Sequence, residues 1–405
     1  MFKNIDVIFF IEHKDRELAS IQLVTKKLNK KGITTLILPV HFGTFYLFVY
    51  KPKIIVNYGI FFDSQLPLNI SRNLFDNVLY VSMNWEQLLS PINLEFKKPR
   101  GEYTLNQVFH IAWDEVFKNY LISSGVNSNN ISVTGNILHE VLFTQIQQKN
   151  VDIVNEYNIN QYEKVIFSPM NLAWAFLREG QLEYRLNLGY DKQTLYEHHD
   201  LAKRYLEILS SWITDAAKNL PNYLFILRPH PNVCIEDYYS FYNNKKLVIP
   251  NNLKISKQHT ISEWLSVADV VCSNWSTVVY DANRIGINAA LLSPIKRPPW
   301  LNVPWNDNVT NIKSYEEFLT FLSDTSNEKK STSSLIRNSE SENVASYIEK
   351  LLEGQIKRPT VALKGDANFK DFKNILKQLL RFISCKFLHC KFVGKGLKYD
   401  FFDKI

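Results

Sequence analysis

The chain lacks an apolar run of the roughly 18 residues that a membrane-spanning helix requires. Its first apolar segment, residues 5–11, is followed at once by the charged stretch from Glu12 to Arg16. The segment also lacks the long apolar region and the small-residue cleavage site of a secretory signal peptide. We interpret it as the first buried strand of the fold, and we expect a cytoplasmic protein.

Cysteine is scarce, with four residues in 405, and no two of them form a Cys-x-x-Cys pair. This spacing argues against a disulfide framework and against a zinc site of the usual kind. Cys385, His389 and Cys390 lie on one short segment. We interpret the two cysteines as small apolar residues of a helix rather than as metal ligands.

The motifs of several large enzyme classes are also absent. No Gly-x-Gly-x-x-Gly follows a strand, so a nicotinamide or flavin site is not expected. There is no P-loop, no His-Glu-x-x-His and no Gly-x-Ser-x-Gly, which removes several kinase and hydrolase classes. No Asp-x-Asp pair follows a strand to hold a divalent cation against phosphates. We therefore expect neither a metal nor a cofactor.

Most of the chain carries no net positive charge. Residues 355–405 contain 12 Lys and Arg and 4 Asp and Glu, a balance of +8, whereas residues 1–354 carry 35 and 36, a balance of −1. The body of the protein has no excess positive charge to offer phosphate backbones, so nucleic acid is not an expected partner.

What the chain does contain is an alternation of short apolar runs with helical patterns, which indicates parallel α/β units. Hydrophobic residues make up 45% of the sequence, enough for packed cores. A polar stretch at 145–163 interrupts the alternation, which then restarts. The runs that we interpret as strands are 5–11, 34–39, 53–57, 78–82, 107–112 and 131–134, then 164–168, 223–228, 246–249, 270–272 and 289–292. We predict an α/β fold with two Rossmann-like domains, 1–150 and 160–354, facing a central cleft, and a helical tail at 355–405.

Two segments after predicted strands of the second half carry groups that bind phosphate. The first is Arg228-Pro229-His230-Pro231, in which the prolines restrict the backbone and Arg228 and His230 offer donors. The second runs from Ser273 and Asn274 through Trp275 to Ser276 and Thr277 and opens a helix. Hydroxyls there cap N–H groups, and helix N-termini attract anions. Either segment alone is compatible with an ordinary loop or cap, but together they indicate a metal-free phosphate clamp.

Three further residues of this half are candidates for the same ligand. Ser168 and Asn171 follow the strand after the linker, where a first strand-to-helix turn approaches a bound nucleotide. Asp281 lies one turn into the helix that begins near Ser276, where it faces either a ribose hydroxyl or solvent.

In the first half, charged residues follow two predicted strands. His13, Arg16 and Glu17 follow the first, and Glu86 follows the fourth. A carboxylate at a strand end can deprotonate an acceptor hydroxyl, but it can equally be a solvated acid at a helix start.

The order of these segments resembles the bacterial surface carbohydrate biosynthesis protein family, which is similar to glycosyltransferases of the GT-B fold. The resemblance covers about residues 5–310 and rests on Glu12-His13-Lys14-Asp15-Arg16-Glu17-Leu18, Thr134-Gly135-Asn136, Ser168-Pro169-Met170-Asn171, Arg228-Pro229-His230-Pro231 and Ser273-Asn274-Trp275-Ser276-Thr277. The last two segments also resemble phosphate-binding motifs of sialyltransferases and Kdo transferases, and equally those of CDP-glycerol glycerophosphotransferases. Ile137-Leu138 and Ser168-Pro169 depart from the usual Gly-Asn-Pro-Arg and Asn-Thr-Asn-Phe runs, which leaves the donor and acceptor open.

The resemblance implies a metal-independent glycosyltransferase that uses a cytidine-nucleotide donor, expected to be a CMP-linked keto-sugar acid. Arg228, His230, Ser276 and Thr277 would hold the donor phosphate, and Glu86 would be the general base. The acceptor would be a glycan, lipid-linked or not, of a capsule or lipopolysaccharide, on the side of His13, Arg16 and Glu17. The alternatives are transfer of a polyol phosphate from a CDP-polyol, a catalytically silent scaffold or glycan-binding subunit, and a nucleotide-sugar epimerase.

The tail has a helical pattern with two chemically different sides. Phe372, Ile375, Leu376, Leu379, Leu380, Ile383 and Phe387 recur at helical spacing, and Lys370, Lys373, Lys377 and Arg381 alternate around them. A basic amphipathic helix at 369–393 suits an anionic membrane surface at the inner face of the cytoplasmic membrane. The same pattern suits a closing helix that packs on the protein body.

Overall fold

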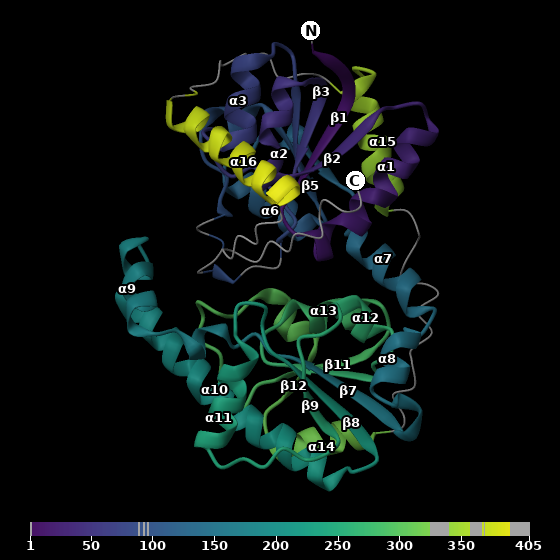
Figure 1. Ribbon diagram of the computed structural model, residues 1–405, viewed down its shortest axis with the longest axis vertical. Coiled ribbons are helices and arrows are strands. Elements are labelled where there is room, and N and C mark those ends of the chain that lie inside the picture. The colour runs from purple at the N-terminus through teal and green to yellow at the C-terminus, as the bar shows by residue number, and fades with distance from the viewer. Residues whose placement is uncertain are drawn as a thin grey trace. The chain divides into compact units, whose positions relative to one another are not determined.

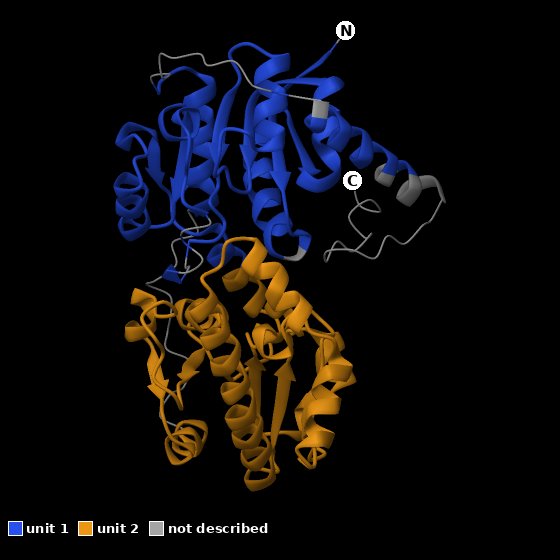
Figure 2. Cartoon of the chain, turned by 90° about the vertical axis from the view of Figure 1, so that its left-hand side faces the viewer, with its two compact units in different colours: residues 1–141, 337–405 blue, residues 142–336 orange. Residues whose placement is uncertain are grey.

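The computed structural model describes residues 2–87, 90–91, 94, 97–324, 340–356, 367 and 369–388. His389, Cys390 and the rest of the predicted tail helix beyond 388 lie outside the described residues. The chain forms two compact units, drawn in separate colours in Figure 2. Unit 1 contains residues 1–141 and 337–405, and unit 2 contains residues 142–336.

Unit 1 is built on a six-stranded parallel sheet in the order β2-β1-β3-β4-β5-β6. The predicted strands of the first half are present with small changes at their ends. They are β1 (Lys3–Ile11), β2 (Thr35–Pro39), β3 (Tyr50–Asn57), β4 (Leu79–Ser82), β5 (Val108–Ala112) and β6 (Ile131–Val133).

Strand β1, between β2 and β3, is buried on both sides because its side chains alternate between two cores. Val7, Phe9 and Ile11 pack toward α1 (Ala19–Lys30) and α15 (Glu340–Leu352). Ile8 and Phe10 pack on the opposite side of the sheet. That side is covered by α2 (Val40–Gly43), η2 (Thr44–Phe48), α3 (Leu66–Leu74) and α16 (Phe369–Leu388). Figure 1 labels α2, α3 and α16. Uninterrupted apolar strands of this kind are typical of parallel sheets with helices on both faces.

Helix α15 belongs to unit 1. The sequence analysis, in contrast, predicted residues 160–354 as one domain. Val344, Ile348 and Leu351 of α15 are buried in the core around β1, and α15 lies beside α1 (Figure 1). Lys31 reinforces this packing with an ion pair to Glu349 at 2.7 Å. The apolar stripe of α15 could pack on the sheet of either domain. The periodicity of the sequence alone therefore does not show which sheet the helix covers.

Unit 2 contains a second six-stranded parallel sheet, in the order β12-β11-β10-β7-β8-β9. Its strands are β7 (Lys164–Pro169), β8 (Tyr223–Arg228), β9 (Leu253–Ile255), β10 (Val270–Ser273), β11 (Asn288–Leu292) and β12 (Thr310–Ile312). The prediction of a strand at 246–249 was wrong. Lys246 has a φ of 55°, and the chain turns after the preceding helix before it enters β9.

Helices cover both sides of the second sheet. The stacked rings of Phe167 and Trp264, 5.8 Å apart, join β7 to α12 on one side. On the other side Leu209 and Ile213 of α10 are buried with Ile166 and Phe225. The helices in and leading into this unit are α7 (Ile137–Ile146), α8 (Val151–Glu156), α9 (Glu179–Asn187), α10 (Lys192–Asn219), α11 (Ile235–Asn244), α12 (Ile261–Leu265), α13 (Thr277–Arg284) and α14 (Tyr315–Ser323). The two sheets confirm the prediction of two Rossmann-like domains.

Candidate functional site

The strand order of unit 2 places several predicted residues at one edge of its sheet. Strands β8 and β9 follow β7 on one side of it in the sheet. Strands β10, β11 and β12 then lie in order on the other side of β7. The order reverses between β7 and β10. In such sheets, ligands bind outside the carboxyl ends of the strands at the reversal point. Ser168 near the end of β7 and Ser273 at the end of β10 therefore flank the expected binding crevice.

Asn274 holds the loop that follows β7. Its Oδ1 accepts the backbone N–H of Asn171 at 2.9 Å, and its Nδ2 donates to the carbonyl of Asn171 at 3.0 Å. The Ser273 hydroxyl donates to the carbonyl of Pro169. Both side chains are fully buried. Ser273 and Asn274, which the sequence suggested as phosphate-binding, thus use these polar atoms to position the loop.

Ser168 differs from its neighbours because its buried Oγ has no hydrogen-bond partner in the described part of the chain. An unsatisfied buried hydroxyl costs about 1–3 kcal/mol. A group left in this state at a strand-order reversal is a candidate for pairing with a ligand or an ordered water.

Arg228 and His230 lie at the end of β8, the strand beside β7. The carbonyl of Arg228 accepts the N–H of Met170, which ties this strand end to the loop after β7. The Arg228 guanidinium donates from Nη1 to the carbonyl of Gln258 at 2.6 Å. This contact holds the arginine at the carboxyl edge of the sheet.

His230 is held as a neutral donor. Its Nδ1 accepts the N–H of Asn232 at 3.2 Å, so the ring proton is on Nε2. Burial, with a smaller effect from the positive charge of Lys257, lowers the pKa of His230. Lys257 itself donates to the carbonyls of Pro231 and Val233 at 2.8 and 2.7 Å and so fixes this loop. Lys257 was not expected from the sequence, because it is distant from the Arg-Pro-His-Pro segment along the chain.

The helix α13 begins as predicted at the second segment. Ser276 is its N-cap residue, and its Oγ accepts the N–H of Val278 at 3.3 Å. Thr277 is the first helical residue and is exposed, and Asp281 is half-buried one turn further on. The N-terminal N–H groups of α13 and the end of β10 therefore lie at the same sheet edge as Ser168 and Arg228.

An aromatic cluster beside this edge was not predicted. The ring of His198, in α10, stacks on Trp174 at 4.1 Å and lies 5.1 Å from Trp300 and 6.0 Å from Trp275. Both ring nitrogens of His198 are buried without a partner in the described chain. Burial lowers the pKa of His198 to about 3, so the ring is neutral. The tryptophans follow different strands and the histidine lies on a helix, so no local pattern brings them together.

In unit 1 the charged residues that follow β1 and β4 do meet. Arg16 donates from Nη1 to Oε1 of Glu86 at 2.6 Å and from Nη2 to Oε1 of Glu17 at 2.7 Å. Glu17 is fully buried and also accepts the N–H of Glu12 at 2.8 Å. Burial raises the pKa of Glu17, against the effect of the Arg16 charge. His13 is exposed, and its Nε2 lies 3.7 Å from the Glu12 carboxylate.

Lys97 completes this cluster, although no sequence motif marks it. Its ammonium pairs with Oε2 of Glu86, so each oxygen of that carboxylate contacts one cation. Burial and the charge of Arg16 lower the pKa of Lys97 to about 8, while the charges of Glu12 and Glu17 act in the opposite direction. Both oxygens of the Glu86 carboxylate are therefore engaged by cations.

The strand order of unit 1 reverses between β1 and β3, so the cluster that follows β1 lies where a ligand is expected. Asn57, the last residue of β3, is buried there, and its side-chain amide has no partner in the described chain. A small hollow nearby is lined by Phe61, Asn84, Glu86, Lys97 and other residues.

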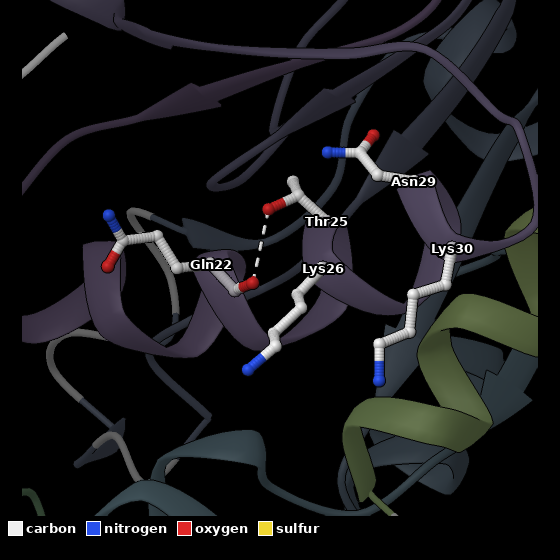
Figure 3. A pocket seen from close by; sticks show the side chains of 5 residues that line it. All are labelled: Gln22, Thr25, Lys26, Asn29 and Lys30. Atoms are coloured by element: carbon white, nitrogen blue, oxygen red, sulfur yellow. Dashed lines mark hydrogen bonds between the residues drawn. The ribbon is translucent and has the colours of Figure 1, made fainter.

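A larger hollow of about 560 Å³ lies along α1 and is open to solvent. Figure 3 shows its lining side chains, Gln22, Thr25, Lys26, Asn29 and Lys30. These residues lie along a helix that runs back from the carboxyl edge of the sheet, and they include none of the predicted site residues. We place the candidate site at the strand ends because the polar groups converge there.

Comparison with models of protein families and with curated proteins gives no match. Solved structures with the same fold do exist. The UDP-GlcNAc 2-epimerase of Methanocaldococcus jannaschii, in complex with UDP-GlcNAc and UDP, aligns with a TM-score of 0.53 and 14% identity over 86% of this chain and 99% of that chain. S. aureus MnaA with UDP aligns with a TM-score of 0.54 and 11% identity over 89% and 99%.

The wall teichoic acid polymerase TagF, in its H444N form with CDPG, aligns with a TM-score of 0.51 and 12% identity over 87% of this chain and 90% of that chain. Identities this low carry the fold and not the activity. The chain therefore has the two-domain, GT-B-like architecture that the sequence predicted, shared with sugar-nucleotide epimerases and a wall teichoic acid polymerase.

Proposed function

We propose that this chain is an enzyme of bacterial surface carbohydrate biosynthesis that acts on a nucleotide-activated sugar. The observation that carries the proposal is the convergence of Arg228, His230 and the N-terminus of α13 around the strand-order reversal of unit 2. These groups are donors without negative charge, and they suit the phosphate of a nucleotide. The same-fold structures that hold UDP-GlcNAc, UDP and CDPG support a nucleotide ligand.

The reaction we propose is metal-independent glycosyl transfer from a cytidine nucleotide, with a CMP-linked keto-sugar acid as donor. In this proposal Arg228 and the Nε2–H of His230 stabilise the charge that grows on the leaving phosphate. Ser276 and Thr277 hold the same phosphate from the start of α13. Ser168, Asn171 and Asp281 are the remaining candidates for nucleotide contacts.

Unit 1 would bind the acceptor, a glycan of a capsule or lipopolysaccharide. His13, Arg16 and Glu17 are the candidate acceptor-side residues, and Glu86 is the candidate base. For Glu86 to take the acceptor proton, the acceptor must displace Lys97 or Arg16 from its carboxylate. We place the reaction in the cytoplasm, where nucleotide-activated donors are made.

A second candidate is transfer of a polyol phosphate from a CDP-polyol, favoured by the shared fold with TagF in its CDPG complex. A third is epimerisation of a UDP-sugar, favoured by the shared fold with the 2-epimerases. The three reactions differ in the donor that they consume and in whether the nucleotide is released. Sugar transfer from a one-phosphate donor and polyol-phosphate transfer from a two-phosphate donor both release CMP, whereas epimerisation leaves the nucleotide attached.

The experiment that separates them incubates the protein with one donor at a time and identifies the products by mass spectrometry. CMP release from a CMP-linked keto-sugar acid, without added metal, would support the proposal. CMP release from CDP-glycerol alone, or conversion of UDP-GlcNAc to its epimer, would replace it with the second or third candidate. If no donor is consumed and none binds, the chain is a catalytically silent scaffold.

A further inference from the structure

The helix α16 packs on unit 1 through one side. Ile375 is buried in the core with Val40 and Leu47, and α16 contacts α2 and η2. Asn69 of α3 donates to the Asp371 carboxylate at 3.1 Å. These contacts fix the orientation of α16, drawn in yellow in Figure 1, relative to the sheet of unit 1. The tail helix is therefore a closing element of unit 1.

The side of α16 that flanks the buried Ile375, about 100° around the helix axis from it, exposes large apolar residues. Phe372, Leu376, Leu380 and Ile383 are 40–55% exposed and follow one another at intervals of four, four and three residues. This spacing puts them in one stripe along the helix. Single exposed apolar residues are common, but a continuous stripe marks an interaction surface.

The stripe continues onto the body of unit 1. The ring of Phe48 lies 6.5 Å from that of Phe372, and Phe48 and Val49 are 42% and 41% exposed. The N–H of Lys3 donates to the carbonyl of Val49, which brings the exposed Phe2 to the same edge. We call this surface the docking face: Phe2, Phe48, Val49, Phe372, Leu376, Leu380 and Ile383.

Lysines surround the docking face. Lys373 and Lys377 are exposed on α16, and Lys3 and Lys51 are exposed at the adjoining strand ends. The one acidic residue among the described part of α16, Asp371, is bonded to Asn69. The sequence from 355 to 405 carries a balance of +8. An apolar stripe with a basic border matches the chemistry of an anionic bilayer surface.

We propose that the docking face binds the surface of an anionic lipid bilayer, with α16 lying in the plane of the interface. The apolar side chains enter the boundary between headgroups and acyl chains, and the lysines contact the headgroups. Among the described residues, no helix combines the length and the apolarity of a membrane span. The association that we propose is peripheral. The proposal concerns where unit 1 is held, and it stands whichever sugar-nucleotide reaction the chain performs.

The test is co-sedimentation of the full chain with vesicles of phosphatidylcholine, with and without phosphatidylglycerol. The wild type should pellet with the phosphatidylglycerol vesicles and be released by salt, because salt screens the lysines. Leu376→Ser combined with Leu380→Ser should abolish pelleting. Lys373→Glu combined with Lys377→Glu should weaken it by more than about fivefold for each lysine.

The matched control is Tyr184→Ser combined with Val248→Ser, which removes two exposed apolar residues of unit 2 that are 62% and 74% exposed. This variant should bind vesicles as the wild type does. Circular dichroism melts of every variant establish that each one folds. Equal binding by wild type and the α16 variants, or no preference for phosphatidylglycerol, would overturn the proposal. So would a wild-type dimer that the Leu376 and Leu380 changes dissociate, because a second copy would then cover the docking face.

Discussion

Arg16 and Glu86 are 70 residues apart in sequence and form an ion pair with 2.6 Å between Nη1 and Oε1. The pair joins the segment after β1 to the segment after β4. Arg16 also supplies the cation for the buried carboxylate of Glu17. One arginine therefore fixes both acids of the candidate acceptor side, and this arrangement yields the first prediction.

Replacing Arg16 by Gln should destabilise the protein by about 3 kcal/mol, because it leaves the Glu17 carboxylate buried without its cation. The added change Glu17→Gln should restore part of the loss, because the uncompensated charge is then removed. Urea denaturation of the two single variants and the double variant at neutral pH measures this coupling. If the losses in unfolding free energy of the two single variants simply add in the double variant, Glu17 is not a buried carboxylate whose charge Arg16 neutralises.

The two most buried histidines should make stability depend on pH. Burial lowers the pKa of His198 to about 3 and that of His110 to about 4. In the unfolded chain both titrate near 6.5. Between these values the unfolded state binds more protons, so the free energy of unfolding falls as pH falls from about 6.5 to about 4. The slope should approach about 1.4 kcal/mol per pH unit for each histidine.

Urea melts across this pH range measure the slope, and His198→Phe should reduce it by about half. His13→Asn is the control for the loss of an exposed histidine, because the His13 side chain is 54% exposed. An unchanged slope in the His198 variant would mean that His198 is protonated in the folded protein.

The loop after β7 should depend on Asn274. Replacing Asn274 by Ala removes both hydrogen bonds to Asn171 and leaves that backbone unpaired, at a cost of about 2 kcal/mol. If the loop also shapes the nucleotide site, the variant should lose ligand stabilisation as well. Asn283→Ala, which removes one hydrogen bond at the far end of α13, is the control. A variant as stable as the wild type would show that Asn274 does not hold the loop.

The assignment of α15 to unit 1 can be tested by its core residue Ile348. Ile348→Ala should cost about 2–4 kcal/mol, because the side chain is fully buried among β1, β3 and α1. Glu349→Ala removes only the exposed pair with Lys31 and should cost less than about 1 kcal/mol. Thermal melts compare the two, and similar costs would contradict the packing described.

Much of the fold could be predicted because short stretches of sequence determine many of its helices and strands. The apolar runs of β1, β7 and β8 predict strands, and the capping serine of α13 predicts the start of a helix. The placement of α15 could not be predicted, since its apolar stripe fits either sheet. The strand predicted at 246–249 failed because the positive φ of Lys246 is a property of the folded turn.

Some residues of the candidate site could be predicted from the sequence, and others could not. Arg228, His230 and Ser276 are in short motifs at strand ends, so the sequence suffices to propose them. Lys97 and His198 act through partners on other segments of the fold, Glu86 and Trp174, and no local motif predicts these contacts. Asn274 has the expected location, but its polar atoms serve the loop.

The most direct test of the central claim is calorimetric titration of the protein with CMP, CDP, UMP, UDP and GDP. The account predicts binding of a cytidine nucleotide without added metal, lost in Arg228→Ala and His230→Ala. Arg204→Ala, an exposed arginine of α10, should bind as the wild type does. Binding of uridine nucleotides instead would favour the epimerase reaction. Binding that survives both Arg228→Ala and His230→Ala, or no binding of any nucleotide, would contradict the site proposed in unit 2.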